Sequence, residues 1–337
     1  MSNDLISPRN QERPLRHHDS APVPTSLRNT NFYFAAYLCV VALIFVRTLS
    51  NLVAFASHYE YGSHIPLIPF VAAYLIFVRR KTIFSNVQHS FRTGGVLLFL
   101  GIASFWMSHD HLVSLNENDA LAWATASIVL ICIAGFVICY GSGTSRRALF
   151  PLLFLFLMVP IPTFVVEKAI FLLREGSTSI TMGIFQICNV PAVRNGFAIS
   201  VPGVTIEIAQ ECSGIRSTLA LLITCLLASY LFLQSKMRRI IFLFLIVPMA
   251  VVKNGIRIAT LTLLSIYVDP RFLYGRLHHD GGIVFFLLAL LLLAPILWLL
   301  QVSERPKHPK PFPGADMEKP DREVPSVAGE INHVLGD

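Results

Sequence analysis

One cysteine in this sequence stands where a reactive thiol would be favoured. Cys212 lies in the run Glu-Cys-Ser-Gly-Ile-Arg, which starts at Glu211 and ends at Arg216. An apolar run begins at about Gly214, so we expect the cysteine to precede the first turn of a helix. The positive end of the helix dipole and a neighbouring cation both favour the thiolate. Cys212 is therefore a candidate nucleophile. The alternatives are that it is a buried structural cysteine or that it forms a disulfide with Cys188.

An arginine lies inside another apolar run. Residues 254–257 read Asn-Gly-Ile-Arg, and on a helix Lys253 and Asn254 would share one face with Arg257. Placing an arginine inside an apolar membrane helix costs free energy, so such an arginine is usually functional or paired with another group. A fixed guanidinium is well suited to stabilising the negative charge on a tetrahedral oxyanion. The alternative is a structural ion pair with Glu207, Glu211 or Asp269.

A histidine pair stands just before the last apolar run. His278 and His279 precede Asp280, and a histidine is the natural general acid and base near neutral pH. Consecutive positions on a helix or strand point apart, so a metal site is disfavoured, and we expect no metal and no cofactor. A thiol, a guanidinium and an imidazole on one membrane face would make an acyl-transfer site. In such a site Glu211 could orient the base or hold Arg216.

These segments are embedded in a chain with too few charges for a soluble protein. Hydrophobic residues make up 54% of the 337 residues and charged ones 14%, whereas a soluble domain has about 25% charged residues. Several apolar runs approach the length that a helix needs to cross a membrane. The expected spans, about eight in number, are 32–55, 65–78, 94–107, 120–140, 148–165, 214–233, 240–266 and 283–300.

The polar segments complete the expected fold. Residues 1–31 and 303–337 are expected to be disordered cytoplasmic tails of a polytopic membrane domain at 32–302. Residues 167–210 form the longest stretch between expected spans. Within it, apolar residues alternate on both sides of Pro202-Gly203, which predicts a β-hairpin with a type II turn at the membrane surface. The predicted class is therefore an all-α membrane protein with a small extracytoplasmic hairpin before the candidate catalytic cysteine.

The charge distribution predicts the orientation. The net charge is +7, but the basic residues form short clusters beside apolar runs, as at 79–81, 146–147 and 236–239. This pattern is typical of the cytoplasmic flanks of membrane helices rather than of a nucleic-acid surface. The stretches 57–64 and 108–119 hold no lysine or arginine. We therefore expect both termini in the cytoplasm and the three candidate segments at the outer face.

At these residues the sequence resembles the exosortase/archaeosortase family of multi-pass cysteine transpeptidase-like enzymes. The resemblance rests on Cys-Ser-Gly-Ile-Arg at 212–216, on Asn-Gly-Ile-Arg at 254–257, and on His278 with Gly282 four positions later. The three motifs occur in the family's order, and the similarity extends over roughly residues 32–300.

The resemblance implies a role for each residue. Cys212 would be the nucleophile of a membrane-bound cysteine peptidase or transpeptidase, Arg257 the transition-state stabiliser and His278 the acid and base. The adjacent His279 leaves the identity of the base ambiguous by one position. The implied partners are the lipid bilayer and exported proteins with a C-terminal sorting signal of the PEP-CTERM type, which has a short motif, an apolar helix and basic residues.

Two other function classes remain open at this level. A transporter or channel could use Arg47, Lys253 and Arg257 to line a polar path, although no inverted repeat is visible. A non-catalytic subunit of a polysaccharide or protein export system would require the protein to be present but would not require the Cys212 thiol. Replacing Cys212 would inactivate a thiol enzyme but would leave a transporter or such a subunit functional.

Overall fold

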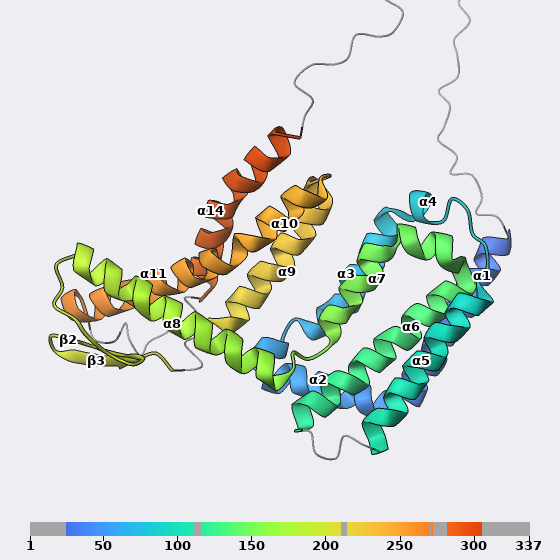
Figure 1. The fold of residues 1–337 in the computed structure, drawn as a ribbon, viewed down its shortest axis with the longest axis horizontal. Coiled ribbons are helices and arrows are strands. Elements are labelled where there is room, and N and C mark those ends of the chain that lie inside the picture. Colours follow the sequence, from blue (N-terminus) through green and yellow to red (C-terminus); the bar gives the residue numbers. More distant parts are fainter. Residues whose placement is uncertain (1–24, 111–115, 210–213, 270, 272–281, 305–337) are drawn as a thin grey trace, which may run out of the picture.

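The computed structural model describes residues 25–110, 116–209, 214–269, 271 and 282–304, and these form a helical molecule with one small sheet (Figure 1). The expected tails before residue 25 and after residue 304 lie outside the described residues. The first helix, α1, begins at Thr25, earlier than the expected first span at residue 32.

Among the described residues, the regular elements of the first half of the chain are all helices. α5 and α6 form its most extensive helix pair, and α1 packs against α6. Its elements are α1 (Thr25–Ile44), α2 (Val46–His58), η1 (Glu60–Gly62), η2 (Ile65–Leu67), α3 (Ile68–Val78), α4 (Arg80–Ile83), α5 (Phe91–Asp110), α6 (Glu117–Arg147), α7 (Leu149–Phe154) and η3 (Leu155–Met158).

The second half adds the sheet. Its elements are α8 (Thr163–Ile187), β1 (Val193–Asn195), β2 (Ala198–Val201), β3 (Val204–Glu207), α9 (Ile215–Phe232), α10 (Lys236–Phe244), α11 (Ile246–Tyr267) and α14 (Gly282–Val302). The two halves meet where residues of α9, among them Ile223 and Leu226, pack against Ile68, Ala72 and Phe154 of α3 and α7.

The expected count of eight spans is not confirmed. Five helices in the described part of the chain are long and apolar enough to cross a membrane, or six if one bent pair counts as a single span. Several expected spans are short or broken: the run 32–55 is divided between α1 and α2, and the apolar helices Ile65–Val78 and Phe91–Met107 are short. Length and composition therefore establish a multi-span helical protein but not its exact number of crossings.

The helix α8 is the main departure from the sequence prediction. The segment after residue 167 was expected to be a polar stretch between spans, but it is helical as far as Ile187. The chain bends by 87° before α8, at Pro160 and Pro162, which interrupt a helix. The buried side of α8 includes the small polar residues Ser177 and Thr181, so the polar residues of this stretch belong to a packed helix rather than to a loop.

The predicted hairpin is confirmed and is part of a three-stranded antiparallel sheet in the order β1-β2-β3. Val201 pairs with Val204 across the turn, and Gly203 has a φ of 87°, the positive value that the third residue of a type II turn requires. Ile199 and Ile208 are buried and pack with Phe185 and Ile258. The sheet therefore lies against α8 and α11.

Glycines let α8 and α11 approach closely. A methyl group on Gly255 of α11 would lie 2.5 Å from Ile180 Cγ2, and one on Gly176 of α8 would lie 2.6 Å from Val251 Cγ1. The Thr181 hydroxyl donates to the Gly255 carbonyl oxygen at 3.2 Å, which joins the two helices at the same level. Small residues at this interface fix the spacing of the two backbones.

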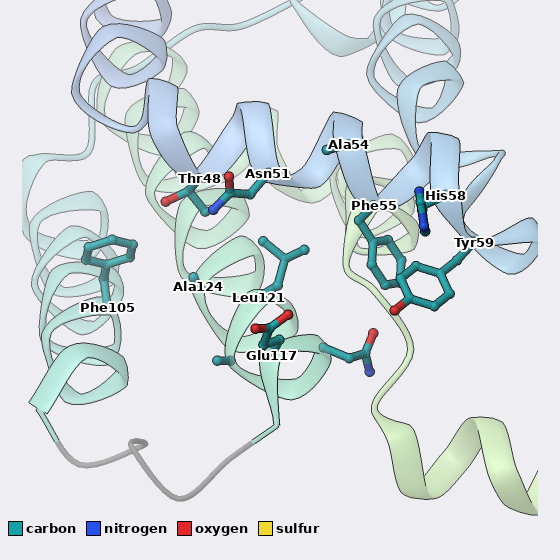
Figure 2. A pocket seen from close by; sticks show the side chains of 12 residues that line it. Thr48, Asn51, Ala54, Phe55, His58, Tyr59, Phe105, Glu117, Leu121 and Ala124 are labelled. Atoms are coloured by element: carbon teal, nitrogen blue, oxygen red, sulfur yellow. The ribbon is translucent and has the colours of Figure 1, made fainter.

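A cavity of about 780 Å³ lies between α2, α5 and α6 (Figure 2). Its lining side chains are both polar and apolar. They are Thr48, Asn51, Ala54, Phe55, His58, Tyr59, Phe105, Glu117, Asn118, Ala120, Leu121 and Ala124.

The close α8–α11 contact gives a stability prediction. Gly255→Ala should destabilise the protein by about 1–3 kcal/mol, because the added methyl group overpacks the interface against Ile180. Thermal unfolding of the purified protein in detergent measures the effect. Gly183→Ala is the matched control, because Gly183 also lies in a helix of this pair and its added methyl group meets no described atom within 4 Å. Equal melting temperatures for the two variants would contradict the interface.

Candidate functional site

The sequence-predicted site residues divide into two groups. Cys212, Glu211, His278 and His279 lie outside the described residues. Arg216, Asn254 and Arg257 are described, as is Gly214, which closes the short segment that contains the cysteine. The described residues therefore test how this segment is held, but they do not test whether thiol, guanidinium and imidazole meet.

The start of α9 lies against the middle of α11. Gly214 is the N-cap of α9 and has a φ of 74°, in the left-handed region that favours glycine. A methyl group at this position would lie 2.7 Å from Asn254 Oδ1. Only a glycine therefore fits both the backbone conformation and the space beside the Asn254 amide. Two of the predicted motifs, 212–216 and 254–257, are in contact through this pair.

The Asn254 side chain is completely buried, and its Nδ2 donates to Ser177 Oγ of α8 at 3.0 Å. Ser177 is itself completely buried. The unexpected helix α8 thus holds the asparagine that lies against Gly214. A buried amide N–H group without an acceptor would destabilise the fold, so the hydrogen bond to Ser177 fixes the orientation of the Asn254 side chain.

Lys253 provides a second connection between α11 and the start of α9. Its side chain is only 3% exposed, and its Nζ donates to Ser217 Oγ. Ser217 Oγ in turn donates to the Gly214 carbonyl oxygen at 3.0 Å. No ion pair joins Lys253 to a carboxylate among the residues that the structure describes. The first turn of α9 is therefore fixed by two neighbouring side chains of α11.

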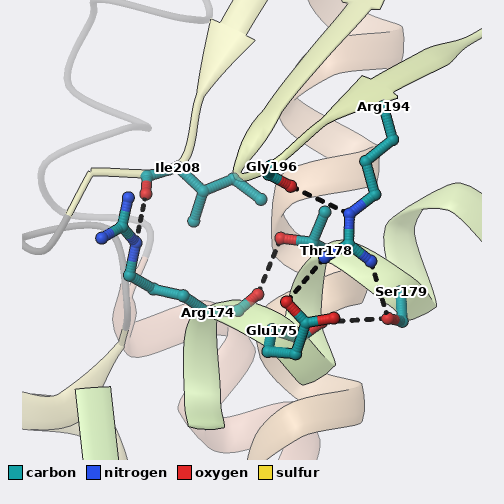
Figure 3. Close-up of polar contacts among 7 residues, drawn as sticks. All are labelled: Arg174, Glu175, Thr178, Ser179, Arg194, Gly196 and Ile208. Carbon is teal, nitrogen blue, oxygen red and sulfur yellow. Dashed lines mark hydrogen bonds and ion pairs between the residues drawn. The ribbon is translucent and has the colours of Figure 1, made fainter. Parts of the chain in front are cut away.

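The sheet holds the other end of the cysteine segment (Figure 3). Arg174 of α8 donates through Nε to the Ile208 carbonyl oxygen at 2.6 Å, and its guanidinium lies 4.0 Å from the Phe197 ring centroid. Arg194 of β1 forms an ion pair of 2.6 Å with Glu175 and also donates to Ser179. α8 therefore anchors the sheet.

The described residues that flank the segment of Cys212 are both anchored. On one side the Ile208 carbonyl is held by α8, and on the other side Gly214 is held by α11. Five residues, 209–213, separate these two anchored positions in the sequence.

Arg257 and Arg216 differ in their surroundings. Arg257 is half-buried on α11, one turn beyond Lys253 and Asn254, on the helix that contacts Gly214. Arg216 is exposed in the first turn of α9. A half-buried guanidinium is partly desolvated and can stabilise negative charge more strongly than an exposed one. Of the two, Arg257 has the surroundings that better suit the oxyanion role expected from the sequence.

Sequence reasoning did not identify Arg174, Ser177 and Ser217 as part of this arrangement. Each acts through a contact distant in sequence, so no short motif marks it. The apolar positions of α8 at helical spacing were the available signal, because they predict a packed helix rather than a loop. Among the described residues, no group of three histidine, cysteine or acidic side chains is placed to hold a metal ion.

The Gly214–Asn254 contact gives a second prediction. Gly214→Ala should destabilise the protein by more than the ~1–2 kcal/mol that an L-residue loses at positive φ, because its methyl group also meets the Asn254 amide. Gly196→Ala is the matched control: its φ is 59°, but its methyl group meets no described atom within 4 Å. Thermal unfolding compares the two, and Gly214→Ala should melt at the lower temperature.

A double-mutant cycle isolates the contact. In an Asn254→Ala background the additional loss from Gly214→Ala should shrink to that of the control, because the clashing amide is gone. If Gly214→Ala causes the same additional loss of stability in the Asn254→Ala background as in the wild type, the two residues do not touch.

The comparison with protein families identifies the chain. Residues 56–295 match the model of a family described as transmembrane exosortase, and this range contains all three of the predicted motifs. Comparisons with curated proteins and with solved structures each found no significant match. The family match covers most of the chain and agrees with its apolar helices. The protein is therefore a multi-pass membrane protein that belongs to the transmembrane exosortase family.

Proposed function

We propose that this protein is a membrane cysteine transpeptidase or protease that cleaves the C-terminal sorting signal of exported proteins. The observation that carries the proposal is the contact between two motifs of the family: Gly214, two residues after Cys212, lies against Asn254 of the helix that carries Arg257. The proposal is supported by the family match over residues 56–295.

The proposed reaction proceeds through a thioester. The Cys212 thiolate adds to the carbonyl carbon of the scissile peptide bond, and Arg257 stabilises the charge on the carbonyl oxygen. The carbon–nitrogen bond then breaks, and His278 gives a proton to the leaving amine. In the second half, an amine or water attacks the thioester while the imidazole takes its proton, and the thiolate leaves. Each proton that the histidine loses is thus recovered.

We further propose that the reaction takes place at the outer face of the cell membrane, with both termini in the cytoplasm. The start of α1, the helix α4 and the end of α14 lie at one end of the molecule, and the start of α9 lies toward the other (Figure 1). The cluster Arg79-Arg80-Lys81 belongs to the first end, at α4, and the cluster Lys236, Arg238 and Arg239 opens α10 there. The positive-inside rule favours the cytoplasm for that end.

The nucleophile gives the first functional prediction. Cys212→Ala should abolish processing of a tagged substrate that carries a C-terminal sorting signal, because no thioester can form without the thiol. Cleavage is read by immunoblotting of membranes from cells that produce both proteins. Cys225→Ala is the matched control, since this buried cysteine of α9 packs in an apolar core and has no proposed role in the reaction. Normal processing by Cys212→Ala at wild-type protein levels would refute the thiol mechanism.

The histidine pair gives the second functional prediction. His278→Ala should lower the rate by about 100-fold or more, the range of general acid and base catalysis, while His279→Ala should retain most of the activity. Initial rates in proteoliposomes with a fluorogenic signal peptide compare the two variants. The reverse order would assign the proton transfer to His279.

A further inference from the structure

The cavity between α2, α5 and α6 takes no part in the proposed reaction, yet its lining combines a carboxylate, other polar side chains and aromatic rings. The carboxylate of Glu117 on α6 faces the space, and Thr48 and Asn51 of α2 lie across from it (Figure 2). Glu117 forms no ion pair with any described residue. No lysine or arginine is among the described residues that line the cavity, and His58 is the basic side chain there.

The neighbouring Asn118 is a fixed part of this wall. Its Nδ2 donates to the Ile161 carbonyl at 3.0 Å and to Thr163 Oγ1 at 3.1 Å. Its Oδ1 is buried beyond the reach of a water-sized molecule. A ligand in the cavity therefore meets the Glu117 carboxylate rather than the Asn118 carbonyl oxygen.

The N-terminus of helix α6 does not reverse the preference of the cavity for a cation. The positive end of the α6 dipole is equivalent to about half a unit charge. The first turn of α6 carries two carboxylates, Glu117 and Asp119, and the Asn116 side chain caps it by accepting from the Asp119 N–H at 2.9 Å. The positive end of the α6 dipole is therefore opposed by the charges of two carboxylates.

Aromatic rings form another wall. The ring of Phe55 lies 4.7 Å from that of Tyr59 and 5.7 Å from that of Tyr61, measured between centroids. Elsewhere in the protein, aromatic rings are covered by internal cations: Arg79 lies 4.3 Å from the Tyr230 ring centroid. None of the described lysines and arginines lies over Phe55 or Tyr59. Phe55 is itself buried, whereas Tyr59 is 46% exposed, so the Tyr59 ring is available to an external cation.

From this lining we propose that the cavity is a binding site for a molecule that carries a primary ammonium group. The ammonium donates to Glu117 and lies against the Tyr59 ring, while Phe105, Leu121 and Ala124 line the apolar part of the cavity. The volume of about 780 Å³ exceeds what a small amine fills and is in the range of sites for larger ligands. The source is either an aminophospholipid headgroup or a soluble amine. The proposal does not depend on the transpeptidase reaction.

The test uses the full-length protein in nanodiscs of phosphatidylcholine with and without phosphatidylethanolamine, and native mass spectrometry counts the lipids retained. Glu117→Gln should lower retention of phosphatidylethanolamine by about tenfold or more, because a charge-assisted bond is lost. Tyr59→Leu should also lower it through loss of the ring. Glu167→Gln removes a charge from an exposed acid of α8 outside the cavity and should retain the lipid as wild type does.

A second arm measures protection of residues 48–59 and 117–124 from hydrogen exchange by ethanolamine in detergent. Protection by ethanolamine that requires Glu117, without preferential lipid retention, would support the site with a soluble amine as its ligand. Equal retention and equal protection in wild type and Glu117→Gln, or selectivity for phosphatidylcholine, would overturn the proposal.

Discussion

A buried amide in the interior of a membrane protein must find its hydrogen-bond partners within the protein, because the surrounding lipid offers none. Asn254 meets this requirement through its Nδ2, which donates to Ser177, and its Oδ1 edge lies against Gly214. The spacing of α8 and α11 and the start of α9 are therefore fixed together. The glycines at 176 and 255 make this possible, since a larger side chain at either position would hold the two helices apart.

This constraint positions the candidate site from both sides. The sheet is tied to α8 through Arg174 and through the Glu175–Arg194 ion pair, and the first turn of α9 is tied to α11 through Lys253 and Ser217. In the sequence, Cys212 lies between these two anchored parts.

Local signals made the hairpin and the apolar helices predictable. Pro202-Gly203 specifies the turn of the hairpin through the backbone preferences of these two residues. Long apolar runs specify helices by composition alone. The break between α1 and α2 depends on packing, as does the helical state of the stretch after residue 167, whereas Pro160 and Pro162 mark the bend into α8 locally. The contact of Asn254 with Ser177 joins residues 77 positions apart, so only the folded chain reveals it. The family motifs predicted Asn254 and Arg257 as site residues but not what would hold them.

The most direct test of the account is to trap the proposed covalent intermediate. Purified protein in liposomes is mixed with a signal-bearing substrate, quenched in acid, digested and analysed by mass spectrometry. The account predicts that the peptide containing Cys212 gains the mass of the amino-terminal substrate fragment and loses it in neutral hydroxylamine, as a thioester does. Cleavage of the substrate with the fragment attached to another residue, or with no adduct on Cys212 under any quench, would contradict it.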